Sequence, residues 1–206
     1  YPSAQIITET EDIFSDSVID LVVIATPNIL HFPLAKQALQ KGKHVVVEKP
    51  FTVTSKEADE LLELAREKKK LLTVHQNRRW DSDFKTVQKV ISSGMLGKLV
   101  EYEAHYDRFR NYIKENAWRE IPQPGSGILY DLGSHLIDQA LCLFGLPHEV
   151  YADIRTQRNK GEADDAFQIT LHYPEMKATL KASMLVREPL PHYILLGEQG
   201  SFIKYG

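Results

Sequence analysis

A short run of apolar residues leads directly into a charged tripeptide in the first quarter of the chain. The segment His44-Val45-Val46-Val47 has the β-branched residues typical of a strand covered on both faces, as in parallel sheets. Glu48-Lys49-Pro50 follows at once. Open sheets of this class bind their ligands outside the carboxyl ends of the strands. We therefore predict that Lys49 is directed at a ligand.

The composition is ordinary for a globular protein. Of its residues, 43% are hydrophobic and 26% are charged. The length of 206 residues is enough for one large or two small domains. The formal net charge of −3 gives no reason to expect a nucleic-acid partner. The single cysteine, Cys142, excludes an internal disulfide, and its place in an apolar-periodic helix predicts a small buried side chain. Because no apolar run approaches the ~18 residues of a membrane span, and no signal peptide is visible, we expect a cytoplasmic protein without membrane contact.

The first half of the chain alternates predicted strands and helices. Strands are predicted at 20–25, 44–47 and 71–75, and helices at 31–41, after the capping box Thr54-Ser55-Lys56-Glu57, and at 82–93. This order with short connections predicts a parallel sheet with right-handed crossovers. Each strand ends in polar residues, namely Thr26-Pro27-Asn28, Glu48-Lys49-Pro50 and Gln76-Asn77-Arg78-Arg79. We expect these three groups to gather at one edge of the sheet.

The pattern changes after Gly94-Met95-Leu96-Gly97. Alternation over 98–107 predicts a half-exposed strand, 108–127 are irregular, and 131–144 read as a helix. Further strands are predicted at 149–157, 165–173, 177–186 and 192–197. The predicted fold class is therefore α/β: a partial Rossmann-like parallel sheet in residues 1–96, followed by an α+β domain with a mostly antiparallel open sheet in 97–206.

Acidic residues and a histidine share one narrow stripe of the predicted helix 131–144. At about 100° per residue, Asp131, His135 and Asp138 fall within roughly 60° of one another. They could form an ordinary polar face, in which an aspartate near the first turn complements the helix dipole. They could instead provide a general acid/base unit, with Asp131 orienting His135. A metal site would need a third ligand from elsewhere in the chain, so we predict no metal.

The roles of His31 and of the pair Trp118 and Arg119 cannot be decided from the residues alone. His31 opens a helix beside Asn28, so it could contact a ligand or cap that helix. Trp118 and Arg119 lie in the irregular segment, where they could pack over a ligand or merely bury the loop.

The combined motifs resemble the glucose-fructose oxidoreductase / inositol dehydrogenase family, Gfo/Idh/MocA. The similarity covers nearly the whole chain, and the set of motifs is specific although each one alone is weak. In order, the matching motifs are Asp20 to Asn28 with His31, Gly42 to Pro50, Asn77-Arg78-Arg79, Gly94-x-x-Gly97 and Asp131-x-x-x-His135. The run from Asn77 to Phe84 is most similar to a group of bacterial oxidoreductases.

The resemblance implies hydride transfer between a nicotinamide cofactor, NAD or NADP, and the hydroxyl or carbonyl carbon of a sugar, polyol or related small molecule. It implies that Lys49 stabilises the developing alkoxide, that His135 is the general base, and that Asp131 binds substrate or orients His135. It also implies that the Lys49–Pro50 bond is cis. The implied cofactor-binding residues are Thr26, Pro27, Asn28, His31, Glu48, Lys49, Pro50, Asn77, Arg78, Trp118 and Arg119.

One motif of the family is absent from this sequence. Members open with a strand and a G-x-G-x-x-G turn that holds the pyrophosphate, whereas Gly42 is the only glycine here before Gly94. We therefore expect a fragment: the second part of a dinucleotide-binding domain, followed by a substrate domain that is incomplete at its C-terminus. Such a fragment should not bind a dinucleotide well.

Two other functions remain open beside a dehydrogenase. The protein could be a non-catalytic regulator that senses NAD(P) or a sugar, or it could cleave glycosides with the cofactor reoxidised in each turnover. In either case the partner is a small molecule. We also expect a homo-oligomer, a dimer or higher, in which exposed strands at 165–186 pair two subunits.

Overall fold

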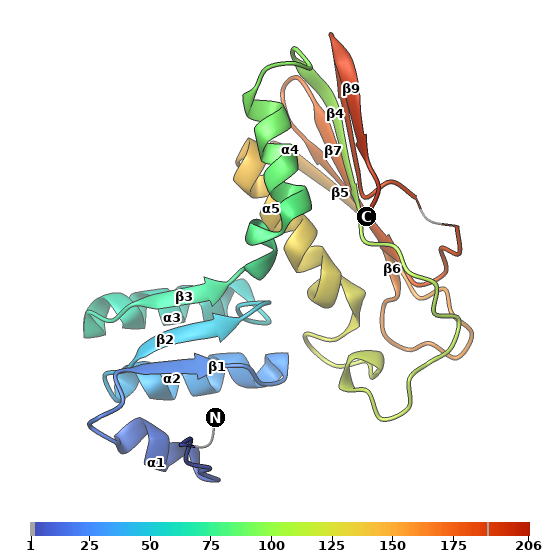
Figure 1. Ribbon diagram of the computed structural model, residues 1–206. Helices are drawn as coiled ribbons and strands as arrows, with labels where there is room; N and C mark the ends of the chain where they lie inside the picture. Colours follow the sequence, from blue (N-terminus) through green and yellow to red (C-terminus); the bar gives the residue numbers. More distant parts are fainter. Residues whose placement is uncertain (1–2, 189) are drawn as a thin grey trace. The chain divides into compact units, whose positions relative to one another are not determined.

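The computed structural model describes residues 3–188 and 190–206 (Figure 1). The chain divides into two compact units, the first ending at His75 and the second beginning at Gln76. The sequence pattern alone places the domain boundary near residue 96, which would put helix α4 (Ser82–Ser92) in the first domain. Because the second compact unit begins at Gln76, α4 lies in the second unit. No helix in the described ranges is long and apolar enough to cross a membrane.

The first unit is a parallel sheet, as predicted, and its helices pack on one face. Its strands lie in the order β1-β2-β3, and Figure 1 shows α2 and α3 on the same side of them. Alternate side chains, such as Ile24, Val45 and Val47, are buried against Leu39 and Leu61 of the helices. The elements are α1 (Thr10–Ser15), β1 (Leu21–Ile24), the 3₁₀ helix η1 (Asn28–Leu30), α2 (His31–Gln40), β2 (His44–Glu48), α3 (Ser55–Lys68) and β3 (Leu72–His75).

Local chemistry sets the start of α3. The hydroxyl of Thr54 accepts a hydrogen bond from the backbone N–H of Glu57 at 3.2 Å, and the Glu57 carboxylate accepts one from the backbone N–H of Thr54 at 3.0 Å. This reciprocal pair satisfies two amides that the first helical turn would leave without partners. The predicted capping box is therefore confirmed.

The other face of the first sheet is open in the described part of the chain. Leu21 and Val23 of β1 are 51% and 62% exposed, and Val46 of β2 is only partly buried. The expectation that His44 to Val47 is covered on both faces is therefore wrong for these residues. A continuous apolar run cannot by itself tell a strand buried on both faces from one with a single packed face.

The second unit is a six-stranded mixed sheet with helices on one face. Its strands lie in the order β5-β6-β7-β4-β8-β9, and every pairing is antiparallel except β4 with β7. Figure 1 shows α4 and α5 on the same side of the sheet, where Val87, Leu136 and Ala140 join its core. Strand β9 was not predicted from the sequence. The other elements are β4 (Leu99–His105), α5 (Ser134–Phe144), β5 (Glu149–Arg155), β6 (Ala166–His172), β7 (Lys177–Ser183), β8 (Tyr193–Gly197) and β9 (Gly200–Lys204).

The helix predicted at 131–144 begins differently from the expectation. Residues Leu129–Gly133 form a π-helical turn, η4, and the α-helix starts only at Ser134. A Cβ at Gly133 would lie 2.8 Å from Leu129 Cδ1 and 3.3 Å from Phe167 Cζ, so glycine permits this packing. Because a π turn closes i→i+5 hydrogen bonds, it contains more residues than an α turn. The angular positions calculated for an ideal α-helix therefore do not hold across Asp131.

Candidate active site

In the first unit, His31 connects two of the polar strand ends. Its Nδ1 lies 2.8 Å from the carbonyl oxygen of Pro50, and its Nε2 lies 3.0 Å from that of Thr26. The ring is fully buried. A carbonyl oxygen only accepts hydrogen bonds, so a ring N–H of His31 is the donor wherever such a bond forms. His31 thus braces the loops after β1 and β2 from inside the protein.

The loop after β2 holds its charged residues in a fixed arrangement. The Glu48 carboxylate lies 2.7 Å from Nδ1 of His75 and also accepts a hydrogen bond from the backbone N–H of Lys49 at 3.3 Å. The Lys49–Pro50 bond is cis, as the family resemblance implied. Lys49 is partly buried and Pro50 is buried. The Lys49 side chain therefore projects from a backbone segment held by the Glu48 carboxylate before it and by the contact of Pro50 with His31 after it.

The third polar group, from Gln76 to Arg79, belongs to the second unit. Asn77 begins the 3₁₀ helix η2 (Asn77–Trp80) and is exposed. Arg78 bonds Asp81 at 3.0 Å, and its guanidinium lies 4.9 Å from the ring centroid of Tyr106. Burial lowers the pKa of Arg78, but Tyr106 and Asp81 outweigh it, so the pKa is raised. Arg78 is thus held by groups of its own unit.

Asp138 is engaged by an arginine from the same polar group. Arg79 donates to both carboxylate oxygens of Asp138, at 2.8 and 2.5 Å. This bidentate bond raises the pKa of Arg79. Of the stripe predicted on this helix, Asp138 is therefore engaged by a bidentate ion pair within the second unit.

Asp131 and His135 lie on either side of the change from π to α geometry. Asp131 is in the π turn, where its carboxylate lies 3.4 Å from Nε of Arg119. His135 is in the first turn of α5 and is only 5% exposed. Single π turns occur mostly within α-helices, frequently at functional sites. Here the turn gives Asp131 a direction that a regular α-helix would not.

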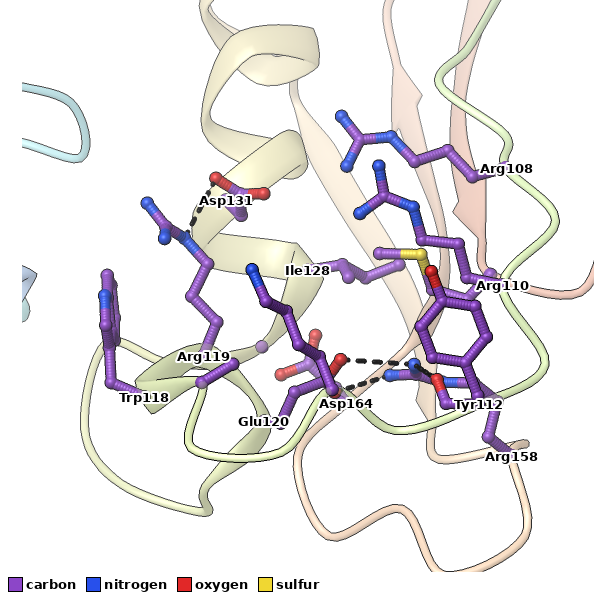
Figure 2. A pocket seen from close by; sticks show the side chains of 14 residues that line it. Arg108, Arg110, Tyr112, Trp118, Arg119, Glu120, Ile128, Asp131, Arg158 and Asp164 are labelled. Carbon is purple, nitrogen blue, oxygen red and sulfur yellow. Dashed lines mark hydrogen bonds and ion pairs between the residues drawn. The ribbon is translucent and has the colours of Figure 1, made fainter.

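A cavity of about 350 Å³ in the second unit gathers Asp131 and the predicted pair Trp118 and Arg119 (Figure 2). The Arg119 guanidinium stacks 4.3 Å from the centroid of the Trp118 ring while it faces Asp131. The sequence left open whether Trp118 and Arg119 pack over a ligand or only bury the loop. In the structure the two side chains pack on each other and also line a cavity, which is compatible with either role. The remaining lining residues, which the sequence did not single out, are Arg108, Arg110, Tyr112, Lys114, Ala117, Glu120, Gly127, Ile128, Arg158, Asp164 and Met184.

A buried arginine holds the irregular segment that forms one wall of the cavity. Arg158 donates to Asp165 at 2.8 Å, to both oxygens of Glu120 at 2.7 and 3.2 Å, and to the backbone oxygen of Tyr112 at 2.8 Å. Its side chain is 3% exposed, and that of Asp165 is fully buried. Burial lowers the pKa of Arg158, but the bonds to Glu120 and Asp165 raise it overall. Arg158 is therefore a structural brace, because these four hydrogen bonds use four of the five N–H groups of its guanidinium.

Two other expectations concern metals and the cysteine. Among the described residues, no group of three His, Cys, Asp or Glu side chains could hold a metal ion. Cys142 is exposed on α5, so the prediction of a buried side chain is wrong. The helix turns Cys142 away from the sheet because its neighbours Leu136 and Ala140 occupy the packed face.

Both units of the chain match models of known protein families. Residues 2–76 match the oxidoreductase family with an NAD-binding Rossmann fold, and residues 84–203 match the GFO/IDH/MocA C-terminal domain. The chain belongs to the GFO/IDH/MocA family. The resemblance inferred from the sequence motifs is thereby confirmed.

Individual relatives in the GFO/IDH/MocA family agree with this assignment over the whole chain. The oxidoreductase YdgJ of Escherichia coli, described as uncharacterized, is 47% identical over 206 residues, and scyllo-inositol 2-dehydrogenase (NADP(+)) IolW of Bacillus subtilis is 44% identical. Among solved structures, the Bacillus subtilis protein yvaA superposes with a TM-score of 0.96 at 44% identity. An NAD-binding protein from Listeria innocua gives 0.93 at 31%. Each comparison covers 100% of this chain but only 57–59% of the relative.

The first unit fits part of an NAD(P)-binding domain. It has the parallel strands, and its polar strand ends at Thr26 and Glu48 to Pro50 are tied together by His31. It does not contain the glycine-rich turn that would hold the pyrophosphate, because its only glycine, Gly42, ends α2 with a φ of +75°. Residues 2–76 therefore match an NAD-binding Rossmann fold without containing its phosphate-binding turn.

Proposed function

We propose that the full-length protein with this chain is an NAD(P)-dependent dehydrogenase or reductase acting on a CH–OH group of a sugar, polyol or related small molecule. Family membership supports the oxidoreductase class. One relative is named scyllo-inositol 2-dehydrogenase (NADP(+)), which makes a cyclic polyol and NADP⁺ the first pair to test.

The observation that carries the proposal is the constrained loop of Lys49. The backbone of Lys49 bonds to Glu48, and the carbonyl of Pro50 faces the buried ring of His31. An ammonium fixed beside a reacting hydroxyl stabilises the negative charge that develops on its oxygen. We assign this role to Lys49. Thr26, Pro27 and Asn28, at the end of the neighbouring strand, are proposed to line the cofactor.

His135 is proposed as the general base. Its ring is almost fully buried at the start of α5, with Asp131 four residues earlier. An imidazole suits removal of a hydroxyl proton near neutral pH. Asp131 is assigned to substrate binding or to orienting His135, with Trp118 and Arg119 closing over it. The nicotinamide, when bound, accepts the hydride from the carbinol carbon.

The proposal is tested with variants of the full-length protein. We expect Lys49→Ala and His135→Ala each to lower kcat by about 10²- to 10⁴-fold, the range for loss of a charge-stabilising group or of an acid/base group. Lys56→Ala and His148→Ala are matched controls at exposed positions and should keep full activity. If Lys49→Ala and His135→Ala turned over substrate as fast as these controls, the assignment would be wrong.

We further propose that the protein forms a homo-oligomer through the sheet of the second unit. Strand β5 carries exposed apolar side chains, with Val150 at 62%, Tyr151 at 61% and Ile154 at 46%. A monomeric sedimentation profile of the full-length protein would contradict this. Location in the cytoplasm stays a prediction.

A further inference from the structure

The cavity of the second unit carries more positive charge than its own acids neutralise. The charge of Arg158 is paired with those of Glu120 and Asp165, and the charge of Arg119 is paired with that of Asp131. Asp164 accepts a hydrogen bond from the backbone N–H of Leu129 at 2.8 Å. Across the described ranges, the three other cations of the lining form no ion pair. They are Arg108, Arg110 and Lys114.

The backbone places Arg108 and Arg110 side by side. Their segment continues β4 in extended form, with the N–H of Arg108 bonded to Ser183 O at 2.9 Å and that of Arg110 to Met184 O at 2.7 Å. In extended backbone, residues i and i+2 point to the same side. Phe109 points the other way, under the guanidinium of Arg187 at 4.4 Å. Figure 2 shows the guanidinium groups of Arg108 and Arg110 together on one wall of the cavity.

Two like charges in this position are unfavourable unless counter-charges balance both of them. Arg108 is partly buried, and its pKa is lowered first by that burial and then by the charge of Arg110, while the charge of Asp131 offsets only part of the shift. An anion between the two guanidinium groups would offset both effects with its own charge, and arginine forks match carboxylate and phosphate geometry. The arrangement is thus electrostatically incomplete and complementary to a small anion.

We propose that Arg108 and Arg110, assisted by Lys114, bind an anionic group of the substrate, a carboxylate or a phosphate. The substrate class is then a polyhydroxy acid or a sugar phosphate. The cavity volume of about 350 Å³ suits one small molecule, and Asp131 lies in the same cavity. This inference rests on the proposed function, since it places the anion on the molecule whose hydroxyl meets Asp131 and His135.

Binding of simple anions tests the site without requiring turnover. Calorimetric titrations would use the full-length protein saturated with NADPH, so that the cofactor's phosphate sites are filled, with inorganic phosphate and acetate as separate probes. We expect at least one probe to bind, and Arg108→Gln/Arg110→Gln to weaken it by at least about tenfold, the loss of one charge-assisted hydrogen bond. The exposed Arg187→Gln is the matched control and should leave binding unchanged.

The pattern of binding separates the possible outcomes. Tighter phosphate binding indicates a sugar phosphate, and tighter acetate binding indicates a sugar acid. The single variants Arg110→Gln, at an exposed position, and Arg108→Lys, which keeps the charge, guard against misfolding of the double variant. If neither anion binds, or if the double variant binds as the wild type does, the inference is overturned. Since the readout is binding, an inactive enzyme that still binds the anion refutes only the proposed function.

Discussion

Replacing Gly127 by alanine tests how tightly the wall of the cavity is built. Gly127 has a φ of +79°, and a Cβ placed on it would lie 1.8 Å from Oδ1 and 2.4 Å from Cγ of Asp164. The same carboxylate accepts the hydrogen bond from Leu129 N at the start of the π turn. The carboxylate must therefore move, and its bond to Leu129 must break, before any side chain fits at position 127.

The expected loss has two parts that a control can separate. Left-handed backbone costs a non-glycine residue about 1–2 kcal/mol, and a lost hydrogen bond to a charged group costs about 1.5–3 kcal/mol. We expect Gly127→Ala to lower the free energy of unfolding by about 3–4 kcal/mol. Gly94→Ala has nearly the same φ, +70°, but no atom within 4 Å of its Cβ. It should therefore cost only the backbone part, about 1 kcal/mol.

Urea unfolding of four variants completes the measurement. The set is Gly94→Ala, Gly127→Ala, Asp164→Ala and the Gly127→Ala/Asp164→Ala double variant. In the Asp164→Ala background the clash is gone, so Gly127→Ala should then cost no more than Gly94→Ala does. The same cost for Gly127→Ala in both backgrounds would refute the clash.

Three further predictions concern buried polar side chains. Arg158→Met should lower the free energy of unfolding by about 3–5 kcal/mol, because Asp165 is left buried without its cation, and an unchanged urea midpoint would contradict the brace. His31→Leu should cost about 1–3 kcal/mol by leaving buried carbonyls without a donor; a stability equal to wild type would refute this. Burial opposes protonation of His105, but its bonds to Asp107 and Glu103 raise its pKa above 6.5. A group with a raised folded-state pKa stabilises below its unfolded pKa and loses that effect as pH rises through the folded value. The stability advantage of wild type over His105→Gln should therefore be greatest below pH 6.5 and decrease above it, and an advantage that grows with pH would contradict the shift.

The fold was largely predictable because its strands and helices carry strong periodic signals. The valines of β2 and the capping box at Thr54 identified their elements directly. Strand β9 (Gly200–Lys204) was missed because it follows β8 across a tight turn after Gly197, so no separate break in the pattern marks it. Local periodicity does not show which short segment a neighbouring strand will pair with.

The site was predictable only where residue type and spacing carried the signal. Asp131 and His135 were predicted as a pair from their spacing, and that assignment stays a prediction. The π turn that contains Asp131 was not predicted, since it depends on tertiary packing at Gly133. Arg108 and Arg110 were overlooked because their segment has no regular pattern. Their spacing of two residues, directly after a predicted strand, was the available signal.

Transfer of deuterium tests the central claim most directly. The full-length protein would be given NADP⁺ and a polyol or acidic sugar labelled with deuterium on its carbinol carbons, and the reduced cofactor would be analysed by mass spectrometry. Direct hydride transfer predicts one deuterium in each molecule of NADPH formed, and almost no labelled NADPH with Lys49→Ala. Deuterium appearing in the solvent, or turnover without accumulation of reduced cofactor, would contradict the account.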